Sequence, residues 1–63
     1  MAGTLTVVIP TYNEKGNVVE MAKAIREAYP DFRIVFMDDG STDGTVELVK
    51  GLGDPLTSIR VRE

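Results

Sequence analysis

The stretch VFMDDGSTDGT, residues 35–45, joins an apolar run to a turn rich in oxygen atoms. Its first residues complete the run FRIVFM (32–37), which is short and apolar on both faces and therefore predicts a buried strand of a parallel sheet. Residues 37–45 then contain three aspartates, two glycines and three hydroxyl side chains. Such a turn after a buried strand is typical of an α/β fold, in which a helix follows.

Two further strands are predicted on either side of this stretch. The run TLTVVIP (4–10) is also short, β-branched and apolar on both faces, and we expect Pro10 to end it. The run SIRVR (58–62) alternates polar and apolar residues, which predicts a half-buried strand at the edge of the sheet.

A helix is predicted between the first two strands. Asn17 followed by Glu20 resembles a capping box with Asn at the cap, and Pro30 ends the helix. Its apolar residues recur at helical spacing: Val18, Met21, Ala22, Ile25, Ala28 and Tyr29.

A shorter helix is predicted after residues 37–45. Ser41, Thr42 or Asp43 is expected to cap it, and Gly51 or Gly53 to end it. Its apolar face comprises Thr45, Leu48, Val49 and Leu52.

The element order β-α-β-α-β predicts a three-stranded parallel sheet with right-handed crossovers and the spatial order 3-2-1. Both helices then cover one face of the sheet. The first two strands are apolar on their second face as well, and the sequence offers nothing to cover it. We therefore expect residues 1–63 to form a single partial domain, one half of a doubly wound fold, that associates with a second copy.

Composition excludes several classes of function. The net charge of −3 and the lack of a basic cluster argue against non-specific binding of nucleic acid. The chain has no cysteine and no histidine, which excludes disulfides, thiolate metal sites and Ser-His nucleophiles. No apolar run approaches the roughly 20 residues of a membrane span, and no signal peptide is visible. These features predict a cytoplasmic chain.

Ligands of open parallel sheets bind at the carboxyl ends of the strands, where PTYNE (10–14) and DDGSTDG (38–44) lie. Neither loop is rich in Lys or Arg, and neither has a phosphate-binding glycine motif. Their carboxylates suit hydrogen-bond donors, such as ribose hydroxyls or the N–H groups of a base. Residues 39–44 also fit the first six positions of a calcium loop, but position 12 is Lys50 where a glutamate is required.

The same side chains also have purely structural explanations. Ser41 and Asp43 suit a helix cap, and Asn13 suits a turn. Tyr12 suits either ordinary packing or a stacking platform for a base. The adjacent acids Asp38 and Asp39 repel each other at a buried strand end, which favours a functional role for at least one. The remaining residues with a structural alternative are Glu14, Gly40, Gly44, Met21 and Met37.

The segments VVIPTYNE (7–14) and VFMDDGSTDGT (35–45), in this order, resemble the start of the family 2 glycosyltransferases, and most of all the dolichyl-phosphate mannose or glucose synthases. The resemblance implies the Rossmann-like, nucleotide-sugar-binding half of a GT-A fold. Asp39 would accept a hydrogen bond from the base, and Asp38 would support the loop. The nucleotide-binding residues that the resemblance implies are Pro10, Tyr12, Glu14, Met37, Asp38 and Asp39.

Such enzymes transfer sugar from a UDP- or GDP-sugar to an acceptor such as a polyprenyl phosphate, some of them at the cytoplasmic face of a membrane. Their D-x-D motif, which holds Mg²⁺ or Mn²⁺, and their catalytic base would lie beyond residue 63. The resemblance therefore implies a fragment that has no catalytic residue or metal site, is inactive alone, and needs the C-terminal half of its parent. The alternative is a small self-associating α/β module, truncated or engineered, with no catalytic role.

Overall fold

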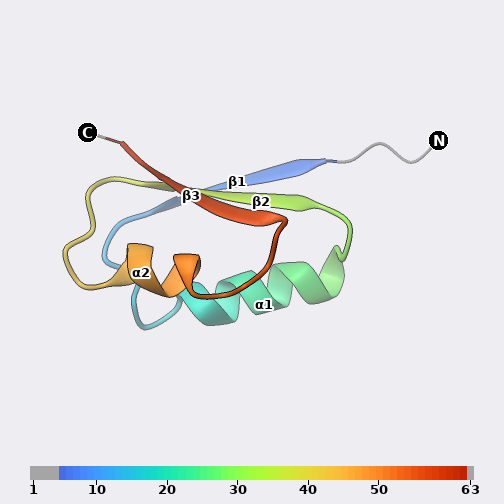
Figure 1. Ribbon diagram of the computed structural model, residues 1–63, viewed down its shortest axis with the longest axis horizontal. Helices are drawn as coiled ribbons and strands as arrows, with labels where there is room; N and C mark the ends of the chain where they lie inside the picture. The colour runs from blue at the N-terminus through green and yellow to red at the C-terminus, as the bar shows by residue number, and fades with distance from the viewer. Residues whose placement is uncertain (1–4, 63) are drawn as a thin grey trace.

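The computed structural model describes residues 5–62 as one parallel sheet with two helices on the same side of it (Figure 1). The sheet order is β1-β2-β3, and both strand pairs are parallel. This confirms the predicted α/β class and strand order. The elements are β1 (Thr6–Thr11), α1 (Val18–Ala28), β2 (Arg33–Asp38), α2 (Thr45–Lys50) and β3 (Thr57–Val61).

The core lies between the central strand β2 and the helices. Ile34 and Phe36 of β2 are fully buried, and side chains alternate across a strand, so both face the helices. Val18 and Ala22 of α1 and Val49 of α2 complete the buried cluster. The predicted helical spacing is thus confirmed for Val18 and Ala22, and for Met21 and Ile25, which pack half-buried against this cluster. It is wrong for Ala28 and Tyr29, which are exposed.

The second face of the sheet carries no helix within residues 5–62 (Figure 1). Val8 of β1 is 59% exposed there, while Val35 and Met37 of β2 are half-buried. We call these three residues, with Pro10, the open face. Within residues 5–62 this arrangement agrees with the expectation that one apolar face of the sheet is left uncovered.

The prediction that Pro10 ends the first strand is wrong, because β1 continues to Thr11. The carbonyls of Leu5 and Thr11 accept the N–H groups of Arg33 and Asp39. The backbone N–H and C=O groups of the odd-numbered residues of β1 therefore point toward β2. The nitrogen of Pro10 therefore points to the outer edge of β1, where no ladder hydrogen bond is lost. The other two strands are displaced by one residue from the predicted runs 32–37 and 58–62.

The predicted helix caps are also partly wrong. Asn17 is the N-cap of α1, but its side chain makes no capping hydrogen bond. The carbonyl of Glu14 instead accepts the N–H groups of Asn17 and Val18, each at 2.8 Å. Helix α2 has Gly44 as its N-cap, with φ 98°, a conformation that favours glycine. A backbone carbonyl thus replaces the Asn17 side chain at α1, and Gly44 occupies the N-cap position of α2 in place of the predicted Ser41, Thr42 or Asp43.

Arg26 ties together three segments at the amino ends of the strands. Its Nε donates to Asp54 Oδ2 at 2.8 Å, and its Nη2 donates to Thr57 Oγ1 at 3.3 Å. Its Nη1 donates to the carbonyls of Tyr29, Pro30 and Phe32. The N–H of Leu56, the hydroxyl of Thr57 and Arg26 hold the pKa of Asp54 below its ordinary value. We call this arrangement the Arg26 cluster.

Candidate functional site

The candidate site lies at the carboxyl ends of β1 and β2, where loops 12–17 and 39–44 begin at the same end of the sheet (Figure 1). Two hydrogen bonds join the strand ends at this point. The N–H of Asp39 donates to the carbonyl of Thr11 at 3.0 Å, and the Thr11 hydroxyl donates to Asp38 Oδ1 at 2.8 Å. The ends of the two strands are therefore fixed relative to each other before either loop begins.

Asp38 is fully buried and accepts hydrogen bonds on both carboxylate oxygens. Oδ2 accepts the N–H groups of Gly40 at 3.0 Å and Ser41 at 2.6 Å. Oδ1 accepts the hydroxyls of Thr11 and Ser41. Burial alone raises the pKa of Asp38, but these donors, the Ser41 hydroxyl foremost, together outweigh it and hold the pKa below its ordinary value. Asp38 thus organises the loop, in line with the supporting role predicted for it.

Asn13 and residues 41–42 bind each other reciprocally. The backbone N–H of Asn13 donates to Ser41 Oγ at 2.8 Å, and the N–H of Thr42 donates to Asn13 Oδ1 at 2.9 Å. Asn13 has φ 50°, in the left-handed region that asparagine tolerates better than most residues. Among residues 5–62 it is the one non-glycine residue with positive φ. We call this pair of hydrogen bonds the Asn13 latch.

A second set of contacts joins the first loop to the residues at the start of α2. The N–H of Glu14 donates to Thr45 Oγ1 at 3.0 Å, and the N–H of Lys15 donates to Asp43 Oδ2 at 3.1 Å. Asp43 Oδ1 also accepts the N–H of Thr45 at 3.1 Å and its hydroxyl. The Thr45 hydroxyl is the main reason that the pKa of Asp43 lies below its ordinary value. Asp43 therefore supports the start of α2, as predicted, and also holds the neighbouring loop.

The predicted nucleotide-binding residues fall into three environments. Asp39 is exposed, with its Oδ1 3.4 Å from Nε of Arg62, and Tyr12 is 57% exposed. Glu14 is half-buried beside the second set of contacts. Pro10 and Met37 are register partners on the open face, and Asp38 is buried within the loop. The carboxylate of Asp39 and the ring of Tyr12 thus remain accessible to a ligand, and their roles stay a prediction.

Sequence reasoning missed the residues that join the two loops. The sequence pattern places Thr45 on an apolar helix face, but its hydroxyl accepts a hydrogen bond from the first loop. The sequence pattern indicates no role for Thr11, which is buried and donates its hydroxyl to Asp38. A hydroxyl residue that ends an apolar strand, and another that begins an apolar helix face, were the signals available.

The described residues do not form a metal site. Within 5–62 no group of three or more acidic side chains is placed to hold an ion. The oxygens of Asp38 and Asp43 are already engaged by donors from the protein. A strand also precedes residues 39–44, where an EF-hand needs a helix. No step that uses a metal is therefore derived from these residues.

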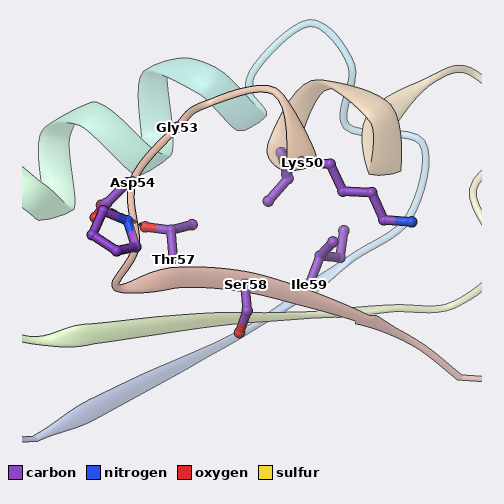
Figure 2. A pocket seen from close by; sticks show the side chains of 8 residues that line it. Lys50, Gly53, Asp54, Thr57, Ser58 and Ile59 are labelled. Atoms are coloured by element: carbon purple, nitrogen blue, oxygen red, sulfur yellow. Dashed lines mark hydrogen bonds between the residues drawn. The ribbon is translucent and has the colours of Figure 1, made fainter.

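A separate pocket of about 420 Å³ lies between α2 and β3 (Figure 2). In this view Ile59 points toward α2 and Ser58 points away from it. The lining residues, which include Lys50 and Asp54, contain none of the predicted nucleotide-binding residues. The site predicted from the sequence is therefore an exposed loop surface at the strand ends, distinct from this pocket.

The comparison with known families decides the relationship of the chain. The profile described as "Glycosyl transferase family 2" matches residues 6–63. The chain belongs to this family. The family and the Rossmann-like fold expected from the two loop segments are thus confirmed.

Two curated proteins illustrate where this family 2 glycosyltransferase chain lies among its relatives. It is 43% identical over 51 residues to "Polyprenol monophosphomannose synthase" of Mycolicibacterium smegmatis. This match covers 78% of the chain and 19% of that protein. It is 31% identical over 62 residues to "Putative glycosyltransferase CsbB" of Bacillus subtilis. This match covers 92% of the chain and 19% of that protein. The chain thus spans about a fifth of the length of these relatives. No solved structure gave a significant match.

Proposed function

We propose that this chain binds the nucleoside of a nucleotide-diphosphate sugar, as part of a family 2 glycosyltransferase. One observation carries the proposal: two loops at adjacent strand ends are fixed to each other, and the carboxylate of Asp39 is left exposed beside them. Parallel sheets bind their ligands at this end. A carboxylate there suits the N–H groups of a base, and the exposed ring of Tyr12 suits stacking.

The reaction belongs in this proposal to the whole enzyme. A relative is named as a polyprenol monophosphomannose synthase. We therefore propose transfer of a hexose from UDP- or GDP-sugar to a polyprenyl phosphate, with Mg²⁺ or Mn²⁺ as cofactor, in the cytoplasm. Residues 5–62 do not fit that metal, and we assign it to none of them. Within residues 5–62 no helix is both long enough and apolar enough to cross a membrane.

Titration of the 63-residue chain with UDP and with GDP, followed by NMR, tests nucleoside binding. We expect the signals of Tyr12, Glu14 and Asp39 to move first. Asp39→Asn should weaken the tighter of the two nucleotides about tenfold, because a hydrogen bond to a charged group contributes about 1.5–3 kcal/mol. The matched control is Asp31→Asn, since Asp31 is exposed before β2, at the opposite end of the sheet.

Unchanged affinity after Asp39→Asn would remove the base-reading role of that residue. Signal shifts confined to the amino ends of the strands would contradict the whole proposal, because they would place the ligand beside the Arg26 cluster.

The open face supports a second proposal, that copies of the chain self-associate. Burying a large apolar side chain contributes about 1.5–3 kcal/mol, and Val8, Val35 and Met37 lie there uncovered by any element of residues 5–62. A twofold dimer is the simplest arrangement that buries this face. Such association is also what the alternative, a module without a catalytic role, requires.

Sedimentation at tens of micromolar tests this association. We expect a mass well above the 6.9 kDa of one chain. Val8→Lys should shift the chain toward monomer, because a charge on the open face is costly to bury. Ala24→Lys adds the same charge on the exposed side of α1 and should leave the association unchanged. A single 6.9 kDa species with a cooperative thermal transition would contradict the proposal.

A further inference from the structure

Asn13 has a geometry that a simple turn does not require. Its side-chain oxygen accepts the N–H of Thr42, and its own N–H donates to the Ser41 hydroxyl. These contacts join residues 28 and 29 positions apart in the sequence. Asn13 therefore links the two loops and does more than allow the first one to turn.

The latch is close in sequence to the two side chains that the proposed function needs. Tyr12 directly precedes Asn13, and Asp39 lies two residues before Ser41. Both Tyr12 and Asp39 are exposed, and each belongs to a different loop. Without a link between the loops, binding a nucleoside would have to fix both of them, and ordering them would reduce the affinity.

We infer that Asn13 is a positioning residue, which holds Tyr12 and Asp39 at a fixed separation so that both can contact one nucleoside. The inference rests on the proposed function, because it concerns the same site. Asn13 itself touches no ligand in this arrangement. It acts through Ser41 and Thr42, and Ser41 in turn donates to the buried Asp38.

The backbone of Asn13 allows a sharp separation of the two possible roles. At φ 50° glycine is at least as well accommodated as asparagine, but glycine has no side-chain acceptor. If Asn13 only formed a turn, Asn13→Gly would bind nucleotide as well as the unchanged chain does. If it positions the loops, Asn13→Gly should bind several-fold more weakly. Asn13→Asp keeps an acceptor oxygen and also tolerates this conformation, so it should bind about as tightly as the unchanged chain.

The experiment measures uridine and guanosine affinity by NMR, because neutral nucleosides respond much less than nucleotides to the charge that Asn13→Asp adds. With whichever nucleoside the unchanged chain binds more tightly, we expect about fivefold weaker binding for Asn13→Gly, the value of one lost hydrogen bond. Asn13→Asp should stay within about twofold. Hydrogen exchange of the Thr42 N–H should quicken in Asn13→Gly alone, while that of buried Phe36 should not change in either variant.

Ser41→Ala provides a second test if Asn13→Gly does not fold, since it removes the acceptor of the Asn13 N–H and should also weaken nucleoside binding. Equal binding by the unchanged chain and by Asn13→Gly would overturn the inference and leave the proposed function standing. Absence of nucleoside binding by the unchanged chain would overturn both.

Discussion

Asp38→Asn is expected to destabilise the chain by about 2–3 kcal/mol, measured by urea unfolding followed by circular dichroism. The amide is neutral and keeps one acceptor oxygen. In either orientation its NH2 group replaces an oxygen that accepts two hydrogen bonds in the unchanged chain, either from the N–H groups of Gly40 and Ser41 or from the hydroxyls of Thr11 and Ser41. A 63-residue domain has a total stability of about 3–9 kcal/mol, so a large part of it depends on this carboxylate.

The pH dependence of unfolding provides the control for this variant. The pKa of Asp38 is lowered in the folded chain, so its contribution is present above the ordinary value of 3.8 and is lost as the pH falls through the folded pKa. Asp43 and Asp54 act in the same direction. Asp38→Asn should therefore reduce the acid sensitivity without abolishing it. The exposed control Asp31→Asn should change stability by less than about 0.5 kcal/mol. Equal stability of the two variants would show that the Asp38 carboxylate is dispensable.

Arg26→Lys is expected to cost about 2 kcal/mol, although it keeps the positive charge. The planar guanidinium reaches Asp54, Thr57 and three carbonyls at once, while a lysine ammonium has three donors on one atom. The three carbonyls belong to the segment between α1 and β2, so losing their hydrogen bonds to Arg26 would loosen this segment. Urea unfolding measures this change.

Arg33→Lys is the matched control for Arg26→Lys, because Arg33 is exposed at the start of β2. It should change stability by less than about 0.5 kcal/mol. Adding Asp54→Asn to each background completes a double-mutant cycle, in which only the Arg26 background should show coupling. Equal effects of the two Arg→Lys variants would mean that the charge of Arg26, and not its geometry, stabilises the cluster.

The fold could be predicted from local patterns because the central strand is apolar on both faces and the helices are apolar on one. Ile34 and Phe36 indicated a buried strand, and Val18 and Ala22 indicated which side of α1 faces it. The carboxyl ends of the strands then had to lie together, which placed Tyr12 and Asp39 in adjacent loops. Chain order and side-chain periodicity alone were sufficient for these conclusions.

The contacts that hold the loops together could not be predicted in the same way. Asn13 binds residues 28 and 29 positions away, and Arg26 binds Asp54 at a separation of 28. Such partners depend on the final packing of the elements, and nothing in the local sequence identifies them. Asn17 shows the converse, because a local capping pattern was present but the carbonyl of Glu14 supplied the contact.

Pro10 also governs how a sheet of this kind could grow into a fibre. Thr6, Val8 and Pro10 turn their backbone groups to the outer edge of β1, beyond which residues 5–62 supply no strand. Two of these positions offer an N–H to an incoming strand, and the third offers a ring without a donor. A strand that docks here can therefore form a complete ladder only along the first part of β1. If it shifts toward Pro10, the carbonyl of the incoming strand that lies opposite Pro10 has no N–H donor. The proline thus opposes misregistered edge-to-edge pairing of copies beside the loops at the carboxyl ends of β1 and β2.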